Sequence, residues 1–160
     1  MKLIRRPVTF GAFGILALVG SAALLHPQRA SADSPFNGAS YVTTVKDSNG
    51  NFASRGVITL HTDHTMSVTD SGQGGPAFSF SSQLGSWQSS GQTGAIGRTI
   101  DFDFPSAGVA RLDYTMTFSS NGTAISGTIT LTDFPLQGNP LGGGGTVLGT
   151  FTFTGQLILP

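Results

Sequence analysis

The sequence predicts an all-β protein, folded as an eight-stranded antiparallel up-and-down barrel. Past residue 33, apolar and polar residues alternate with a period of two in one segment after another, which is typical of half-buried strands. Asn-Gly pairs and clusters of glycine and proline separate these segments, and no helical periodicity of useful length interrupts them. The alternation is clearest in Val109–Phe118, where one side of the strand carries Ala110, Leu112, Tyr114, Met116 and Phe118.

Turn signals separate the first four strands. Asn49-Gly50 closes the first of them, because Asn-Gly between two alternating segments is the strongest short hairpin signal. Residues 62–64 turn the second strand into the third, and the glycine-rich loop 71–76 precedes the fourth, which we expect to bend near Gly85. These strands are predicted over Ser40–Lys46, Phe52–Thr62, Thr65–Asp70 and Phe78–Ser89.

The last four strands follow the same pattern. Residues 105–108 join the fifth strand to the sixth, and Asn121-Gly122 makes a second hairpin between the sixth and the seventh. The longer loop Asp133–Thr146, with four consecutive glycines, precedes the last strand. These strands are predicted over Ile96–Phe104, Val109–Phe118, Ala124–Thr132 and Val147–Leu159.

Short connections between successive strands favour a meander, and strands of this number and length favour its closure into a barrel. Closure also removes the exposed edges that such strands would otherwise offer for aggregation. The alternative is a β-sandwich. An immunoglobulin-type sandwich usually has about seven shorter strands, and its Cys–Trp–Cys hallmark is impossible in a chain without cysteine.

Residues 1–32 are predicted to be a secretory signal peptide, which leaves residues 33–160 as a single barrel domain. Lys2, Arg5 and Arg6 precede the apolar run Val8–Leu25, and Ala30-Ser31-Ala32 offers small residues at the positions that a signal peptidase reads. We therefore expect cleavage near Ala32 and a secreted protein, extracellular or periplasmic. The alternative is an uncleaved anchor, because the apolar run is just long enough to span a bilayer.

Removal of the leader makes the chain acidic. Four of the eight Lys and Arg residues are lost with it, whereas all eight acidic residues are Asp and remain, which gives a net charge of about −4. Nucleic acids and anionic membranes both require clustered cations, so neither is an expected partner of the mature chain. Because the chain has no cysteine, its hydrophobic core must stabilise it without disulfides.

The apolar faces of the last four strands are expected to fill the barrel or to line a cavity for one small ligand. The face of Ile96–Phe104 includes Arg98, a charge on an otherwise apolar side. The residues expected to point inward are Ile96, Ile100, Phe102, Phe104, Leu112, Tyr114, Met116, Phe118, Ile125, Ile129, Leu131, Phe151, Phe153 and Leu157.

The chain resembles the lipocalin-like (calycin) barrels, and more weakly those of allene oxide cyclases and related bacterial cyclases. The resemblance rests on a hairpin at Thr62-Asp63-His64-Thr65, the motif Gly85-Ser86-Trp87, Arg98 on the following strand, and the closing strand 149–155. In lipocalins the Gly-x-Trp motif lies on the first strand, whereas here it lies mid-chain. The resemblance implies a Trp at the closed end with an Arg packed across it, and a small ligand in the lumen.

Six residues are candidates for ligand contact: Arg98, Tyr114, Trp87, Ile100, Phe102 and Phe153. An unpaired charge inside a barrel is costly, so Arg98 should anchor a ligand, stack on Trp87, or turn out to solvent at a strand end. A buried Tyr114 should find a partner for its hydroxyl, as core or as ligand contact. Trp87 is expected to plug the core.

Other clusters are expected to be structural. His61, Asp63 and His64 have the side chains of metal ligands, but residues three apart on a strand face opposite ways, and we expect no metal. Asp101 and Asp103 share a face with Thr99, which we expect to be solvated surface rather than an acid–base pair. No nucleophile, phosphate-binding or dinucleotide motif is present, and no cofactor is expected.

The leading functional hypothesis is therefore a secreted barrel that binds a small apolar ligand in its lumen. One alternative is a cyclase-like enzyme that folds a flexible substrate in a dry cavity with Arg98 and Tyr114 as its polar groups. Another is a filled structural or interaction barrel with no ligand. The sequence indicates neither the ligand nor the oligomeric state.

Overall fold

The computed structural model describes residues 34–74, 80–104 and 107–160. The predicted signal peptide lies outside these residues, and so does the start of the strand expected from Phe78. One short 3₁₀ helix, η1 (Ser71–Gly74), occurs between strands. Among the described residues, no helix is long and apolar enough to cross a membrane.

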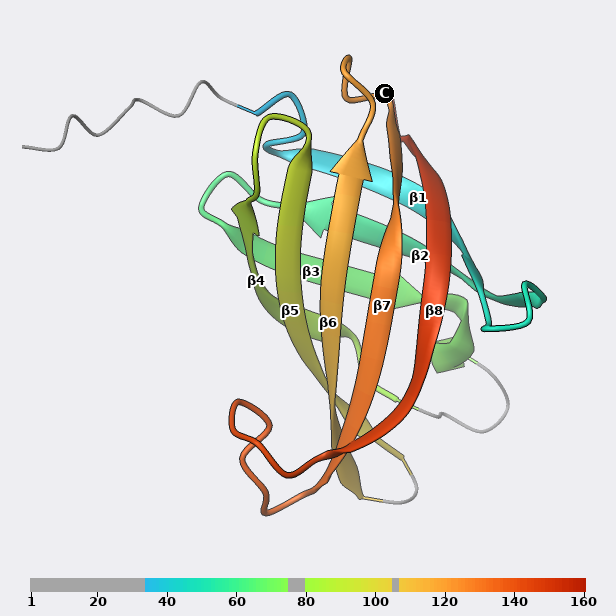
Figure 1. The fold of residues 1–160 in the computed structure, drawn as a ribbon, viewed down its shortest axis with the longest axis vertical. Coiled ribbons are helices and arrows are strands. Elements are labelled where there is room, and N and C mark those ends of the chain that lie inside the picture. Colours follow the sequence, from blue (N-terminus) through green and yellow to red (C-terminus); the bar gives the residue numbers. More distant parts are fainter. Residues whose placement is uncertain (1–33, 75–79, 105–106) are drawn as a thin grey trace, which may run out of the picture. The chain divides into compact units, whose positions relative to one another are not determined.

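Eight antiparallel strands close into one barrel in chain order, with β8 paired to β1 (Figure 1). This confirms the predicted up-and-down barrel over the β-sandwich. Both Asn-Gly hairpins form, with Gly50 and Gly122 at positive φ, a conformation that costs glycine no steric energy. The strands are β1 (Ala39–Lys46), β2 (Phe52–Leu60), β3 (Thr65–Asp70), β4 (Gln83–Ser89), β5 (Gly94–Asp103), β6 (Gly108–Phe118), β7 (Ala124–Pro135) and β8 (Thr146–Leu157).

One end of the barrel is filled by aromatic side chains and is called here the plugged end, defined by Phe36, Trp87 and Phe118. Phe36, which precedes β1, stacks on Phe118 with ring centroids 3.8 Å apart and meets Trp87 edge-on at 5.8 Å. The Tyr41 hydroxyl donates to the Gly122 carbonyl at 2.8 Å, which ties β1 to the hairpin above it. All four aromatic rings are buried, so this end is solid.

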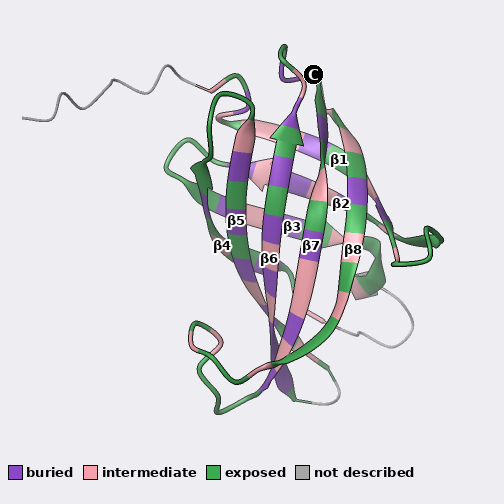
Figure 2. Ribbon diagram, in the orientation of Figure 1, coloured by how far each residue is buried: buried purple, intermediate pink, exposed green. Residues whose placement is uncertain are grey.

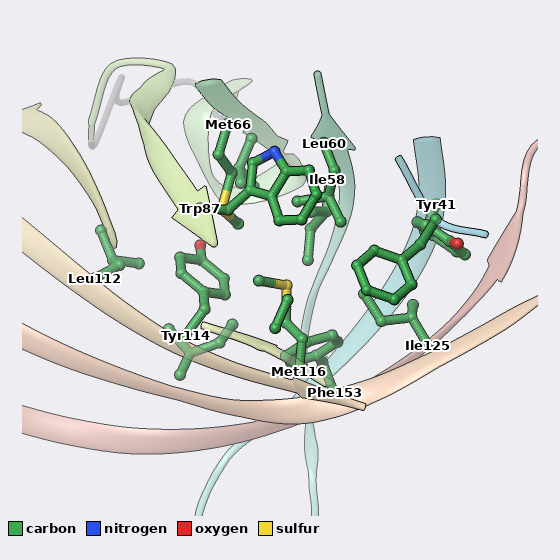
Figure 3. Close-up of a cluster of buried hydrophobic side chains, with 14 of the residues drawn as sticks. Tyr41, Ile58, Leu60, Met66, Trp87, Leu112, Tyr114, Met116, Ile125 and Phe153 are labelled. Atoms are coloured by element: carbon green, nitrogen blue, oxygen red, sulfur yellow. The ribbon is translucent and has the colours of Figure 1, made fainter. Parts of the chain in front are cut away.

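Buried and exposed residues alternate along the strands, as Figure 2 shows most clearly on β6. The inner residues of β6 are those predicted, and Figure 3 shows Met66, Trp87 and Met116 reaching from three strands toward the same part of the lumen. The pairing of β7 with β8 shifts at Leu148 of β8, whereas β7 keeps its register with β6. Thr132 lies opposite Arg111 on the outer face and is buried there with Phe134, close to Gly145 of the following loop.

The predicted inner face of β5 is wrong. Ile96 and Phe102 are 42% and 50% exposed and lie on the outer surface with Phe104 and the half-buried Ile100. The reason is space inside the barrel, because a Cβ at Gly97 would lie 2.6 Å from Met66 Sδ and 3.2 Å from Met116 Cε. These large side chains, from β3 and β6, fill the lumen here, so β5 presents small or polar residues inward: Ala95, Gly97, Thr99 and Asp101.

The loop after β7 folds against the outer surface of β6. The Arg111 guanidinium donates to the carbonyls of Pro140 and Gly142 at 2.9 and 3.0 Å and lies over the Phe134 ring, 5.1 Å from its centroid. These contacts bury Phe134 outside the lumen and hold Arg111 there.

Candidate ligand-binding cavity

A cavity of about 240 Å³ lies inside the barrel, toward the end at which β1, β3, β5 and β7 finish. This end, called here the cavity end, is opposite the plugged end. Most of the lining side chains are apolar, and three are aromatic. The lining consists of Thr43, Val45, Ala53, Ser54, Gly56, Ile58, Val68, Asp70, Gly72, Phe80, Gln83, Leu112, Tyr114, Ile129, Leu131 and Phe151.

A buried polar cluster contributes to the cavity wall. The Tyr114 hydroxyl donates to Gln83 Oε1 at 2.5 Å, and the Thr99 hydroxyl donates to the same oxygen at 3.1 Å. All three side chains are buried. Burial raises the pKa of the Tyr114 hydroxyl, which therefore stays neutral and remains a donor. These hydrogen bonds hold the side chains of Tyr114 and Gln83, both of which line the cavity, in fixed rotamers.

Asp70 is the acidic residue in the cavity lining. Its Oδ2 accepts a hydrogen bond from the Ser54 hydroxyl at 2.7 Å, and its Oδ1 accepts one from the Gly72 N–H at 2.8 Å. Two glycines flank the carboxylate: a Cβ at Gly56 would lie 3.4 Å from Oδ2, and one at Gly72 would lie 3.2 Å from Oδ1 and 3.1 Å from the Phe80 ring. The carboxylate is thus held in place beside an aromatic ring.

The expectation that Asp101 lies on solvated surface is wrong. It points inward, is 3% exposed, and its Oδ1 has no hydrogen-bond partner among the described residues. Burial, reinforced by the neighbouring charge of Asp103, raises the pKa of Asp101 to about 7. Burial and then the charge of Asp133 raise the pKa of Asp103 as well. Asp101 and Asp133 flank Ala110 in the register of β5, β6 and β7.

The described part of the barrel turns the carboxyl groups of Asp70 and Asp101 inward and its Lys and Arg side chains outward. Lys46 and Arg55 are exposed, and Arg98 and Arg111 form ion pairs with Asp113 on the outer face of β6. No Lys or Arg belongs to the cavity lining, and the inner face of the described strands offers Asp70 and Asp101 no cationic partner. The acidic groups near the cavity therefore have no cation to balance them, and the electrostatic potential there favours a cation over an anion.

Of the six residues predicted to contact a ligand, three lie inside the barrel. Tyr114 lines the cavity. Phe153 packs behind it, edge-on, with ring centroids 6.4 Å apart. Trp87 lies at the plugged end, where its indole N–H donates to the His61 carbonyl at 3.0 Å and its ring meets His64 at 5.1 Å. Trp87 is thus a core plug, as the sequence indicated.

The other three lie outside. Arg98 is exposed and paired with Asp113, which corresponds to the solvent-facing alternative; it neither enters the cavity nor stacks on Trp87. In the β4–β5 register Trp87 lies opposite Gly97, and Arg98 lies opposite Ser86, so the two side chains leave opposite faces of the sheet. Ile100 and Phe102 share the outer face with Arg98, and the expectation that they point inward is wrong.

Two larger hollows, of about 610 and 700 Å³, lie over outward-facing residues of the barrel wall. One follows the outer faces of β1, β7 and β8 and includes Arg55, and the other includes Arg98, Asp113 and Leu141. Most of their side chains are exposed, so a ligand there would keep much of its hydration. The smaller lumen cavity removes more apolar surface from water and is the better binding site.

At the hairpin between β2 and β3, the side chains considered as metal ligands make hydrogen bonds to nearby residues. Asp63 Oδ1 accepts hydrogen bonds from the Thr65 N–H and hydroxyl at 2.9 and 2.6 Å, and His61 Nε2 lies 3.1 Å from the Ser67 hydroxyl. Within the described ranges, no group of three or more side chains suited to hold a metal ion is found.

Sequence reasoning named none of the lining residues from the first four strands, among them Asp70, Phe80 and Gln83, and it did not expect Thr99 and Asp101 to be buried beside the cavity. Gln83 could have been found, because it shares the face of Trp87 along one strand, and Trp87 was expected to point inward. Asp70 ends its strand on the face of Val68, which is also a readable signal. Thr99 and Asp101 could not be found, since the sequence assigned their face to solvent.

We expect Gln83→Met to destabilise the protein more than Tyr114→Phe. Tyr114→Phe removes one donor and leaves Gln83 Oε1 bonded to Thr99, which should cost about 1 kcal/mol. Gln83→Met leaves two buried hydroxyls without their acceptor and should cost about 2–3 kcal/mol. Urea denaturation of the two variants measures both values, and a reversed order would show that Gln83 is not the acceptor of both hydroxyls.

Comparison of the chain with protein-family models, curated proteins and solved structures gives no match. The geometry and chemistry of the cavity are thus the basis for inferring a function.

Proposed function

We propose that the protein binds one small, largely apolar molecule in the cavity of its lumen. The observation that carries the proposal is a cavity inside the barrel, lined mainly by apolar and aromatic side chains and by a few oriented polar groups. The predicted leader would deliver such a protein outside the cytoplasm, where it would hold or transport its ligand.

The cavity volume limits the size of the ligand. A dry apolar cavity of about 150 Å³ accommodates benzene, so a volume of about 240 Å³ suits a ligand of roughly ten non-hydrogen atoms. A monocyclic aromatic compound with a short side chain fits this limit, and a long-chain lipid does not. The lining of Ile129, Leu131 and Phe151 would cover its apolar body.

Binding is favoured over cyclase-like catalysis. That alternative used Arg98 and Tyr114 as the polar groups of a dry cavity. Arg98 is on the outer surface, and the Tyr114 hydroxyl is committed to Gln83. The lumen cavity is an apolar site, and its few polar groups suit recognition of a ligand.

We expect a neutral probe, 2-phenylethanol, to bind the wild-type protein and Leu131→Trp to weaken this binding by about tenfold or more. Leu131 lines the cavity, so the indole would occupy the ligand's volume. At saturation the probe should raise the Tm of the wild type by about 5–10 °C, because a ligand that binds only the folded state stabilises it. Isothermal titration calorimetry gives the affinities, and differential scanning calorimetry gives the Tm.

Leu84→Trp is the matched control, because Leu84 is 66% exposed on the outer face of β4 and its replacement leaves the cavity unchanged. Native mass spectrometry of the protein as secreted by its expression host adds an independent measurement, a mass increment from a co-purified small molecule. Equal binding by both tryptophan variants would place the probe outside the lumen and contradict the proposal.

A further inference from the structure

We propose that the ligand is a small organic ammonium, with its apolar body in the lumen cavity and its protonated amine at the Asp70 carboxylate beside the Phe80 ring. This inference rests on the proposed function and names the chemical class of the ligand. An arylalkylamine in which an aromatic ring is joined to a primary amine by a short chain has the required size and shape.

The geometry of Asp70 supplies the first argument. Its carboxylate lines the cavity and already accepts one hydrogen bond at each oxygen, from Ser54 and Gly72. Each carboxylate oxygen has a second acceptor site, and these are what an ammonium group, with three N–H donors, requires. The two existing hydrogen bonds fix the carboxylate, so binding an amine would cost little side-chain entropy.

The Phe80 ring supplies the second argument. A Cβ at Gly72 would lie 3.1–3.2 Å from the Phe80 ring and also 3.2 Å from Asp70 Oδ1, so the ring and the carboxylate approach the same point. Both line the cavity. A carboxylate beside an aromatic ring is the combination that recognises ammonium groups, through an ion pair and a cation–π contact.

The charge of the barrel interior supplies the third argument. Asp70 lines the cavity, and Asp101 follows the buried Thr99 on the inner face of β5, where it ionises only as the pH approaches its raised pKa of about 7. The Lys and Arg side chains of the described residues all lie on the outside of the barrel. Such a site attracts a cation and repels an anion, and it disfavours the carboxylate ligand for which Arg98 was the candidate anchor.

The test compares three probes of similar size and different charge: 2-phenylethylamine, 2-phenylethanol and phenylacetate. At pH 7 the first is a cation, the second is neutral and the third is an anion. Titration calorimetry of the wild type should give an amine affinity about tenfold or more above that of the alcohol, and no measurable binding of phenylacetate.

Asp70→Asn should lower the amine affinity about tenfold and leave the alcohol affinity unchanged. The amide oxygen can accept from the Gly72 N–H and the amide NH₂ can donate to the Ser54 hydroxyl oxygen, so the local contacts persist while the charge is lost. Asp63→Asn is the matched control. The Asp63 carboxylate likewise accepts hydrogen bonds from a hydroxyl and from a backbone N–H two residues ahead, but it lies at a hairpin tip outside the cavity lining. This control should change neither affinity. Phe80→Leu should reduce the preference for the amine by a second, independent route.

Three results would overturn the inference: the alcohol binding as tightly as the amine, Asp70→Asn leaving the amine-to-alcohol ratio unchanged, or phenylacetate binding best. In all three cases the lumen still binds a ligand, and the proposed function stands. Absence of binding by every probe would instead contradict the proposed function itself.

Discussion

Trp87→Ala should lower the free energy of unfolding by about 4 kcal/mol, the largest effect expected of any single core substitution in the barrel. Trp87 is 4% exposed and lies where the plugged end meets the centre of the core. Its indole contacts Phe36 edge-on and His64, and its N–H bonds the His61 carbonyl. Truncation would create a cavity and remove this hydrogen bond, although the His61 carbonyl would keep the one that it accepts from the His64 N–H at 3.1 Å.

The cost is high because the surrounding side chains cannot collapse into the space. Phe36 is stacked on Phe118, and Phe118 in turn packs against Tyr41, whose hydroxyl is tied to Gly122. A network of rings held in this way relaxes only partially. The lost free energy of unfolding then includes the transfer free energy of the indole from water to the core and the cost of the void that remains. Equilibrium urea denaturation followed by far-ultraviolet circular dichroism measures the loss.

Two companion variants make this result specific. Trp87→Phe keeps an aromatic ring and loses the N–H, so it should cost about half as much. Ile96→Ala, on the outer face of β5 and 42% exposed, should cost less than about 1 kcal/mol. A cost for Trp87→Ala no greater than that for Ile96→Ala would show that Trp87 is not a core plug.

The strand order and the closure of the barrel could be predicted because they depend on local signals. Alternation marks the strands, and the two Asn-Gly pairs mark hairpins in which Gly50 and Gly122 have the required positive φ. Short connections then leave little choice of topology. The end of β7 was missed because the strand there exchanges its polar and apolar faces: Phe134 is buried on the outer face beneath the following loop, and Asp133 follows Leu131 on the inner face.

The inner face of β5 could not be predicted in the same way. Alternation shows that a strand has two different faces. The more apolar face points into the core only when the lumen has room for its side chains. In β5 the face with the smaller side chains points inward because Met66 and Met116 occupy the space beside Gly97. This is a property of residues on other strands, and it exposes Ile96 and Phe102 while it buries Thr99 and Asp101.

The candidate site depends on the same reversal. Tyr114 was predicted to need a partner for its hydroxyl, but its acceptor, Gln83, lies on β4 at the other side of β5, and sequence alternation does not give the registers that bring the two together. The sequence places the charge of Arg98 on an apolar face of its strand. That face is the outside of the barrel, where Asp113 pairs with Arg98. The acidic groups that matter for the cavity are Asp70, which the sequence pattern assigns to a strand end, and Asp101, which it assigns to solvent and which is protonated up to about pH 7.

Asp101 should make the protein less stable as the pH rises from about 4 to about 7, and Asp101→Asn should abolish that part of the pH dependence. The folded protein holds the Asp101 proton up to about pH 7, whereas the unfolded chain releases it near pH 3.8. Between these values the folded state binds more protons, so the free energy of unfolding falls with pH, and above them it levels off. A difference of about 3 pKa units corresponds to roughly 4 kcal/mol.

The groups that face Asp101 explain the direction. Asp103 is on its own strand, Asp133 lies across Ala110 on β7, and Asp70 is also directed to the interior from β3. None of them is a cation, so ionisation of Asp101 creates a buried charge that repels its neighbours and has no hydrogen-bond partner at Oδ1.

Urea denaturation of wild type and Asp101→Asn at half-unit steps from pH 4 to pH 8 measures the effect. The difference between the two proteins removes the opposite contribution of exposed carboxyls such as Asp47, whose pKa is lowered by its hydrogen bonds to Asn51 and the turn that follows it. The variant should gain steadily on the wild type up to about pH 7 and then keep a constant advantage. A difference that does not change with pH would mean that Asp101 ionises in the folded protein as it does in the unfolded chain, with water or a bound cation reaching its carboxylate inside the barrel.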